Sequence, residues 1–384
     1  MADKIRVLYI CTDAKLGGST QSLWQMIESI KDNIDPIVLL PAKEESYDFF
    51  TKHGIICIVH PFPYIVSAPP SWAYWKNVFL HPWRLRCIKR MRGNISTAIA
   101  VRRVLNGEKI DIIHSNTTLS TIGIILSKIL RAKHIWHVRE FMDLDFQMYI
   151  EGGLNRLNKI INNADARIVI SNAVKERRKL RNKNTYVLLN PIRKKGEICY
   201  ESNKDKVILF VAYRVTKLKG VEVAISAFAN SKEWERGFKL KIVGNIDADY
   251  KNKLLNIIRE LNILPYVVFV NATNDIKSYF KTASAYIMSS EFEALGRVTA
   301  EAMFFGCPVI AKATGGTLDL IKHGETGYLF KTINECSQLL RKVCEEDQKS
   351  LVLCAQNFAI NNLSQEVYGP KILEIYNKTI QSYL

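Results

Sequence analysis

In the stretch Ser289–Gly316, SSEFEALGRVTAEAMFFGCPVIAKATGG, two of the three carboxylates, Glu293 and Glu301, have seven residues between them. The Ala/Met/Phe-rich segment around Glu301 predicts a helix that ends at Gly306, and the apolar run from Pro308 predicts a strand. The apolar run before Glu293 predicts another strand, so Glu293 falls in a loop between a strand and a helix. In parallel α/β sheets, ligands bind at the ends of strands and against the starts of helices. The stretch therefore predicts a ligand site.

The rest of the chain repeats this alternation of short apolar runs and helical segments. Runs such as IRVLYIC, DIIHSN and KVILFVAYR predict strands, and the segments between them have helical spacing. Apolar strands separated by helices indicate a parallel sheet that is covered on both faces. A single core rarely grows beyond about 250–300 residues, so a chain of 384 residues favours two domains. We therefore predict an α/β protein with two Rossmann-like, doubly wound parallel sheets.

The boundary between these domains is predicted from a change in composition. The run from Ile192 to Lys206 is polar and lacks apolar periodicity, which is typical of a linker. The last segment has apolar residues at helical spacing and predicts a terminal amphipathic helix. We predict a first domain over residues 1–192, a linker over 193–206 and a second domain over 207–363. We expect the helix over 364–384 to pack back toward the first domain.

The composition is that of a globular protein with a strong basic excess, since 48% of the residues are apolar and the net charge is +17. The eight cysteines form no C-x-x-C pair, which indicates reduced thiols in place of a disulfide framework or a zinc site. We find no signal peptide and no uncharged apolar run of about 18 residues. These features predict a cytoplasmic protein.

One segment, residues 62–103, combines cations with aromatic rings, and no acidic residue occurs between Asp48 and Glu108. Such a surface suits anionic lipid headgroups, where each basic residue adds about 1 kcal/mol. The alternative is a solvated basic loop whose aromatic rings pack inward. The sequence carries no helix-turn-helix, zinc-finger or RNP-like signature, so we expect no nucleic-acid partner. The aromatic and basic residues of the segment are Phe62, Tyr64, Trp72, Tyr74, Trp75, Lys76, Phe79, Trp83, Arg84, Arg86, Lys89, Arg90, Arg92, Arg102 and Arg103.

Two further loops have the residue types of an anion site. Gly17 and Gly18 follow the first predicted strand and precede a helix, where paired glycines let the backbone approach a ligand and the helix start offers unpaired N–H groups. A plain tight turn is the alternative. Arg214 ends a predicted strand and Lys219 lies five residues on, before another helix. Two cations there can clamp a diphosphate, and a solvated basic turn is the alternative.

The two carboxylates of the opening stretch suit a different part of the same ligand. A carboxylate accepts hydrogen bonds from two neighbouring hydroxyls, so Glu293 and Glu301 can hold two diols. A nucleotide sugar has such a pair, the ribose and the hexose, joined by a diphosphate. The backbone N–H groups of Ala294, Leu295 and Gly296 can add to an anion cradle. The alternative is that both carboxylates are ordinary surface acids.

Two D-x-D strings suggest a metal-dependent reaction, because such a pair can hold Mn²⁺ or Mg²⁺ on a diphosphate. They are Asp143-Leu144-Asp145 and Asp247-Ala248-Asp249. Neither follows a predicted strand directly, and both lie in polar surroundings. We therefore expect no metal site.

The opening stretch resembles the E-x7-E signature of retaining glycosyltransferases with the GT-B fold, specifically glycosyltransferase family four. It departs from the family pattern at Ala294 and Leu295, where Gly-Phe is usual. The resemblance extends along nearly the whole chain, through Gly17-Gly18, DIIHSN, HIWHVRE, VISNAV, LLNPI, the R-x4-K-G of Arg214 and HGETGYLF. The positions that match within the stretch are Ser290, Glu293, Gly296, Glu301, Ala302, Met303, Gly306, Pro308, Val309, Ile310, Gly315 and Gly316.

The resemblance implies a role for each candidate residue in the second domain. Arg214 and Lys219 would hold the donor diphosphate. Glu301 would bind the ribose, and Glu293 would contact the transferred hexose. The backbone of residues 294–296 would complete the donor site together with the Gly17-Gly18 loop.

The first domain would form the acceptor side. His137, in HIWHVRE, lies where the family often places a histidine near the sugar and the acceptor. The next residues depart from the frequent His-Gly pattern, so His137 has a core histidine as its alternative role. Arg139 and Glu140 are further candidates for the acceptor site.

The resemblance also implies a reaction: transfer of a hexose with retention at the anomeric carbon, without a metal ion or cofactor. We expect a UDP-sugar in preference to a GDP-sugar as co-substrate, and a glycan or lipid-linked acceptor in surface polysaccharide biosynthesis. The basic aromatic segment would then hold the protein peripherally on the inner face of the plasma membrane. The alternatives are a nucleotide-sugar epimerase of the same fold and a non-catalytic polyanion-binding module.

Overall fold

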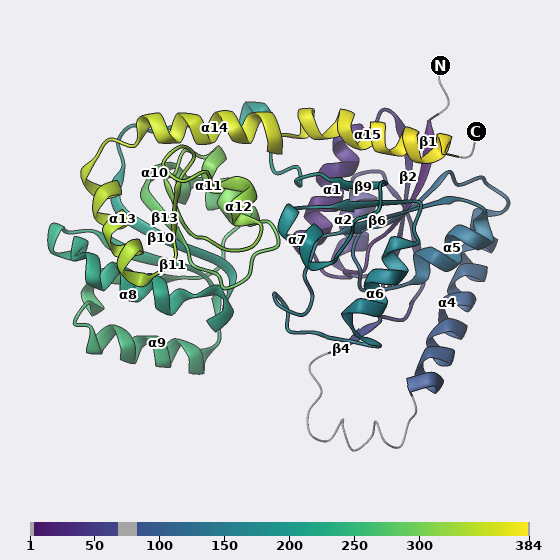
Figure 1. Cartoon of the computed structure of the whole chain (residues 1–384), viewed down its shortest axis with the longest axis horizontal. Coiled ribbons are helices and arrows are strands. Elements are labelled where there is room, and N and C mark those ends of the chain that lie inside the picture. The colour runs from purple at the N-terminus through teal and green to yellow at the C-terminus, as the bar shows by residue number, and fades with distance from the viewer. Residues whose placement is uncertain (1–3, 68–82, 383–384) are drawn as a thin grey trace. The chain divides into compact units, whose positions relative to one another are not determined.

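The computed structural model describes residues 4–67 and 83–382. Contacts between residues divide the chain into two compact units. The first unit consists of Met1–Pro191 together with Gln365–Leu384, and the second consists of Ile192–Ser364. Each unit is built around one parallel sheet with helices on its faces (Figure 1).

The first unit contains a seven-stranded sheet in the order β3-β2-β1-β5-β6-β8-β9, in which every pair of neighbouring strands is parallel. The chain moves outward from β1 in one direction and then returns to start again at β5, so the switch point of the topology lies between these two strands. A small antiparallel pair, β4 and β7, stands apart from this sheet. The strands are β1 (Ile5–Ile10), β2 (Ile34–Leu40), β3 (Ile56–Val59), β4 (Val66–Ser67), β5 (Ile112–Ser115), β6 (Lys133–Val138), β7 (Tyr149–Ile150), β8 (Ala166–Val169) and β9 (Thr185–Val187).

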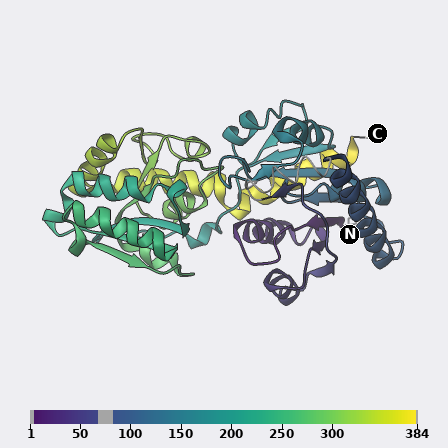
Figure 2. The same ribbon diagram turned by 90° about the horizontal axis from the view of Figure 1, so that it is seen from below.

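Helices cover both faces of this sheet because its strands are apolar on both sides. One core joins Val7 and Tyr9 of β1 to helices α1, α2 and α15, and the other joins Leu8 and Ile10 of β1 to helices α4 and α5. Figure 2 shows this unit from below, with α1 and α2 in purple and α4 in dark blue. The helices are α1 (Gly18–Ile30), α2 (Glu45–Lys52), α4 (Trp83–Leu105), α5 (Ile122–Leu130), α6 (Gly153–Asn162), α7 (Asn172–Arg177) and α15 (Gln365–Gln381).

The second unit contains a six-stranded parallel sheet in the order β12-β11-β10-β13-β14-β15. Its switch point lies between β10 and β13. Helices α8, α9 and α13 share one core with alternate residues of these strands. The strands are β10 (Asp205–Val215), β11 (Lys239–Ile246), β12 (Val267–Val270), β13 (Ala283–Met288), β14 (Val309–Lys312) and β15 (Tyr328–Phe330). The helices are α8 (Val221–Ser231), α9 (Ala248–Glu260), α10 (Ile276–Thr282), α11 (Arg297–Phe304), α12 (Thr317–Leu320), α13 (Ile333–Glu345) and α14 (Lys349–Leu363).

The prediction of two doubly wound parallel sheets is confirmed. Residues 193–206, which we expected to form a linker, belong to the second unit. Their polar groups are used locally: the Cys199 N–H donates to the Phe304 carbonyl, and the Lys204 ammonium donates to the carbonyls of Lys281 and Gly306. A polar segment can thus be fixed to a domain through backbone hydrogen bonds that no apolar pattern reveals.

The terminal helix α15 belongs to the first unit, where it packs against α1 (Figure 1). Gly369 permits this close packing, because a Cβ atom on it would lie 2.6 Å from the Ser29 carbonyl oxygen. Tyr368, Ile372 and Tyr376 on its apolar face are buried in the core beside β1. Within residues 4–67 and 83–382, the helices lack the combination of length and apolarity that crossing a bilayer requires.

Candidate functional site

The candidate residues of the second unit lie on both sides of its topological switch point. Arg214 is at the carboxyl end of β10, and Lys219 lies in the short turn between β10 and α8. Glu293 lies in the loop between β13 and α11, and Glu301 is in the second turn of α11. Because β10 and β13 are parallel neighbours, both loops leave the sheet at the same edge.

These two loops are fastened to each other by backbone contacts. The Ser289 hydroxyl donates to the Gly220 carbonyl over 2.8 Å, and the Glu291 N–H donates to the Leu218 carbonyl over 2.9 Å. Gly220 has a left-handed backbone with φ +72°, and a Cβ atom on it would lie 2.0 Å from the Ser289 carbonyl oxygen. Only glycine tolerates both the conformation and the close approach. This contact brings Lys219 to Glu293.

Lys219 and Glu293 form an ion pair in which the ammonium lies 2.7 Å from the carboxylate. The side chain of Glu293 is 17% exposed and that of Lys219 is 37% exposed, so both remain open to a ligand. A paired carboxylate at a strand end keeps a fixed position and retains lone pairs for further hydrogen bonds. The sequence placed these two residues in separate motifs, and the structure brings them together.

The loop that carries Glu293 is fixed by contacts with Gly315 and Gly316, the last residues of the stretch Ser289–Gly316. The Gly316 N–H donates to the Glu293 carbonyl over 2.7 Å. A Cβ atom on Gly315 would lie 2.2 Å from that same oxygen, and one on Gly316 would lie 2.2 Å from the Ala294 carbonyl oxygen. Gly315 and Gly316 thus pack against the 293–295 backbone.

The start of α11 provides hydrogen-bond donors beside this pair. Gly296 precedes the helix with φ +94°, and no side chain caps the helix at this end. In the part of the chain that the structure describes, the N–H groups of Leu295 and Gly296 donate to no other atom. Unpaired N–H groups at a helix start attract anions. The side chain of Leu295 is buried, so this residue offers its backbone to the site.

Glu301 has two partners that the sequence did not single out. Its carboxylate lies 3.2 Å from a guanidinium nitrogen of Arg193 and 3.6 Å from Nε of Arg297. Arg193 comes from the segment we predicted as a linker, and its guanidinium also stacks over the Phe305 ring. Burial lowers the pKa of Arg297, and Glu301 opposes that shift. Glu301 is therefore a fixed, 8% exposed carboxylate, not a solvated surface acid.

Arg214 differs from the other candidates because its side chain is exposed. Among the described residues, the guanidinium of Arg214 forms no hydrogen bond or ion pair. Its neighbour Tyr213 is 73% exposed, which is uncommon for a tyrosine at a strand end. An unpaired arginine at the switch point is free to bind an anion.

The candidate residues of the first unit also lie near a switch point, between β1 and β5. Gly17 and Gly18 form the turn into α1, with Gly17 in an extended conformation. Asn116, directly after β5, donates to the Ser19 carbonyl over 3.2 Å and accepts from Nε of Arg139 over 2.9 Å. Asn116 thereby connects the glycine turn to the end of β6. Asn116 was not among the predicted site residues.

His137 lies in β6 and is fully buried. Its Nδ1 atom lies 3.2 Å from Nε2 of His114 and 3.2 Å from a guanidinium nitrogen of Arg139. Burial lowers the pKa of both imidazoles well below the ordinary value, and the Arg139 charge lowers them further. Both rings are therefore neutral at pH 7. In the described residues the Nε2 atom of His137 has no hydrogen-bond partner.

Arg139 and Glu140, which we expected on the acceptor side, are 7% and 6% exposed. Arg139 donates to Asn116 and to the side chain of Asn190. The Glu140 carboxylate accepts from the Thr118 N–H over 2.7 Å and from the Thr118 hydroxyl over 2.6 Å. Burial raises the pKa of Glu140, although these bonds and the Arg178 charge oppose the shift. The contacts give Glu140 a structural role in joining β5 to β6.

Three acids of the two D-x-D strings hold local structure. Asp143 pairs with Arg177, and Asp145 accepts from the N–H groups of Phe141 and Met142. Asp247 caps α9 by accepting from the N–H groups of residues 249 and 250. These three side chains thus have roles in their own loop or helix.

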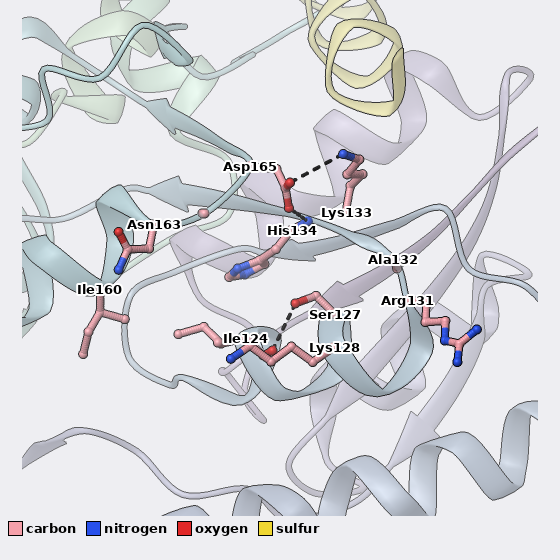
Figure 3. A pocket seen from close by; sticks show the side chains of 11 residues that line it. Ile124, Ser127, Lys128, Arg131, Ala132, Lys133, His134, Ile160, Asn163 and Asp165 are labelled. Carbon is pink, nitrogen blue, oxygen red and sulfur yellow. Dashed lines mark hydrogen bonds and ion pairs between the residues drawn. The ribbon is translucent and has the colours of Figure 1, made fainter. Parts of the chain in front are cut away.

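A hollow of about 720 Å³ opens on the first unit, away from the candidate residues (Figure 3). Lys133 and His134 at the start of β6 line it, as does Asp165 just before β8, so it lies at the amino ends of the strands. Lys133 and Asp165 form an ion pair across 3.6 Å. The helix ends that reach it, those of α5 and α6, are carboxyl ends, which repel anions. This hollow therefore lacks the free N–H groups of a helix start that the opposite edge of the sheet offers.

Comparison with a solved structure defines the fold of this protein. The crystal structure of Anabaena Alr3699/HepE in complex with UDP superposes with a TM-score of 0.79, covers 97% of this chain and 100% of that chain, and is 21% identical. Two doubly wound parallel sheets with this likeness define the GT-B fold. Residues 197–357 match the family model described as glycosyl transferases group 1. This match lies within the second unit, Ile192–Ser364.

Curated relatives that align with parts of this chain are also glycosyltransferases. An uncharacterized glycosyltransferase of Haemophilus influenzae is 31% identical over 132 residues, which cover 34% of this chain and 36% of that protein. An uncharacterized glycosyltransferase of Methanocaldococcus jannaschii is 27% identical over 279 residues, covering 71% of this chain and 75% of that protein. The first alignments span about a third of the relatives' length.

Proposed function

We propose that this protein is a retaining hexosyltransferase that uses a nucleotide-diphosphate sugar, in particular a UDP-sugar. The observation that carries the proposal is the Lys219–Glu293 pair, held beside the uncapped start of α11. One cation, one carboxylate and a row of N–H groups match a diphosphate joined to a sugar. The presence of UDP in the Anabaena structure supports the choice of base.

The proposed chemistry is leaving-group departure assisted by cations. As the bond between the sugar and the diphosphate breaks, negative charge grows on the departing phosphate, and Arg214, Lys219 and the N–H groups of α11 stabilise it. Glu293 holds the sugar hydroxyls and the Lys219 ammonium, so it is poorly placed to attack as a nucleophile. The acceptor then approaches from the face that the phosphate leaves, and the phosphate oxygen takes its proton. These reaction steps need neither a metal ion nor a cofactor.

Donor binding tests the proposal through Glu301. UDP binds only the folded protein and is expected to raise its melting temperature. Glu301→Ala removes the proposed ribose ligand and is expected to weaken UDP binding about tenfold, because a hydrogen bond to a charged group contributes about 1.5–3 kcal/mol. The effect on kcat should be smaller. Isothermal titration and steady-state kinetics measure these two quantities.

Product analysis separates the proposal from its rivals. Slow release of free hexose from a UDP-sugar indicates a transferase without its acceptor, and isomerised donor indicates an epimerase. A polyanion-binding module would leave every UDP-, GDP- and ADP-sugar intact and unbound. The Glu301→Ala variant serves as the binding control in this assay. Retained donor affinity in that variant would contradict the ribose assignment.

We further propose that the acceptor is a lipid-linked glycan of a surface polysaccharide, reached at the inner face of the plasma membrane. The support comes from α4, which exposes an apolar stripe at helical spacing. Ile88, Met91 and Ile95 are 44%, 54% and 38% exposed. Lys89 and Arg92 are exposed beside the stripe. An apolar stripe flanked by cations suits an anionic bilayer surface.

The structure describes only some of the aromatic residues of the segment 62–103. Trp72, Tyr74, Trp75, Lys76 and Phe79 lie outside the described residues. Phe62 is buried, as the inward-packing alternative requires, and the Tyr64 hydroxyl donates to the Thr12 carbonyl. The membrane proposal therefore depends on α4.

Vesicle binding tests this surface. The protein is expected to sediment with vesicles containing anionic lipid and to be released at high salt, because salt screens exposed charges. Replacing Ile88 and Ile95 by Ser should reduce binding several-fold, since each side chain would lose contact with the acyl region.

Val104→Ser is the matched control. Val104 is an apolar residue of the same helix and is 65% exposed. It lies nine residues after Ile95, which places it about half a turn away around the helix. Vesicle binding should be unchanged by this substitution. Equal binding to neutral vesicles, or equal losses in the two variants, would contradict the proposal.

A further inference from the structure

The buried histidines of the first unit belong to a hydrogen-bonded chain that ends on the terminal helix. The Tyr376 hydroxyl of α15 lies 2.8 Å from Nδ1 of His114 and 3.2 Å from the Tyr9 hydroxyl. Nε2 of His114 lies 3.2 Å from Nδ1 of His137. Tyr9, Tyr376 and both histidines are fully buried. Residues separated by more than 200 positions in the sequence thus share one polar network.

The chemistry of Arg139 sets the direction of this network. A guanidinium only donates hydrogen bonds, so Nδ1 of His137 must carry a lone pair where it meets Arg139. The contact between the two imidazoles is then donated by Nε2 of His114. A neutral imidazole has one N–H, so Nδ1 of His114 must accept, and the Tyr376 hydroxyl is its donor. That hydroxyl has one hydrogen, for which the Tyr9 oxygen at 3.2 Å competes, and the imidazole nitrogen at 2.8 Å is the nearer and more basic acceptor.

The same reasoning assigns the hydrogen on His137, the last residue of this hydrogen-bonded chain. His137 is neutral because burial and Arg139 hold its pKa well below the ordinary value. With a lone pair on Nδ1, its hydrogen is on Nε2. That atom is buried and lacks a partner in the described residues. A buried N–H donor without a partner is costly, which makes it a candidate for contact with a ligand.

We propose that Tyr376 is a positioning residue: through His114 it fixes His137 in the tautomer that presents an Nε2–H donor to the substrate. The part played by His137 in turnover rests on the proposed transferase function, whereas the tautomer does not. Tyr376 of the terminal helix would thereby set the tautomer of His137 in β6, although no hydrogen bond joins these two residues directly. His114 links the two residues because it lies within hydrogen-bond distance of both.

Tyr376→Phe tests the proposal because it removes only the hydroxyl that donates to His114. Without that donor, the Nδ1–H form of His114 becomes accessible, and His137 is expected to populate both tautomers. Long-range ¹H–¹⁵N spectra of the protein labelled at histidine report the tautomers without any substrate. The value of kcat should fall about five- to tenfold, the loss of roughly one neutral hydrogen bond, with the donor KM unchanged.

Tyr368→Phe is the matched control on the same helix. Tyr368 is 1% exposed, and its hydroxyl has no hydrogen-bond partner among the described residues. The control should keep the wild-type tautomers and kcat. If Tyr376→Phe folds poorly, His114→Gln, which keeps one donor and one acceptor, should retain more activity than His114→Leu.

Unchanged tautomers in Tyr376→Phe, or equal losses of kcat in the two phenylalanine variants, would overturn the proposal. A changed tautomer with unchanged kcat would overturn the link to turnover. A wild-type protein that holds the expected tautomers but processes no nucleotide sugar would instead count against the proposed function alone.

Discussion

Replacing Lys219 by Met is expected to lower kcat about 10²–10³-fold, the usual loss when one preorganised donor to a developing oxyanion is removed. Lys219 is fixed beside Glu293 at 2.7 Å, so its charge is in place before the donor binds. Donor KM should change much less, because the interaction strengthens as the diphosphate departs. Steady-state kinetics with a UDP-sugar and an acceptor measure both values.

Two further variants make this result specific. Lys217→Met removes an exposed lysine from the same turn and should leave kcat within about twofold of wild type. Glu293→Gln should also reduce kcat, and more strongly than Glu301→Ala does. Because Lys219 and Glu293 act as a pair, the double variant should be little slower than the slower single variant. Fully multiplicative losses would show that the two side chains act independently.

Replacing Gly220 by Ala is expected to destabilise the second unit by about 3 kcal/mol. A left-handed backbone costs a non-glycine residue about 1–2 kcal/mol, and the new Cβ would lie 2.0 Å from the Ser289 carbonyl oxygen. The backbone of one loop must then move away from the other, which adds a cost of about 1–3 kcal/mol. The melting temperature should fall by about 6–12 °C, and activity should fall as Lys219 separates from Glu293.

Gly324→Ala separates the two causes of that loss. Gly324 has φ +77°, close to the value for Gly220, but a Cβ atom on it would meet nothing within 4 Å. With only the conformational cost of about 1.5 kcal/mol, its melting temperature should fall by about 3–6 °C, with activity retained. Similar losses in both variants would show that backbone conformation, and not the contact between the loops, accounts for the effect. Differential scanning calorimetry measures both.

The sequence was sufficient to predict the class of fold and the region of the candidate site. Continuous apolar strands separated by helices have few arrangements other than covered parallel sheets, because both faces must be buried. Parallel sheets bind ligands at their carboxyl ends. Arg214, Lys219 and Glu293 could therefore be assigned to that edge from their positions after predicted strands.

The sequence was less informative about short or polar elements. Strand β15 (Tyr328–Phe330) is three residues long and was not predicted, since so short a run has no measurable periodicity. The segment over 193–206 looked like a linker because its hydrogen bonds are made by the backbone and by Lys204. Such contacts leave no pattern of apolar residues.

What only the tertiary structure decided is which side chains meet. The pairing of Lys219 with Glu293, of Arg193 with Glu301 and of Tyr376 with His114 joins residues 74, 108 and 262 positions apart. Local propensity and periodicity extend over only a few turns or strands, whereas these contacts depend on strand order and on glycines that let two backbones touch. The sequence by itself determined the sheets and the edge at which the candidate site lies. The partners of each charged group were determined by packing, because burying a charge or an imidazole requires a partner that only the folded chain can supply.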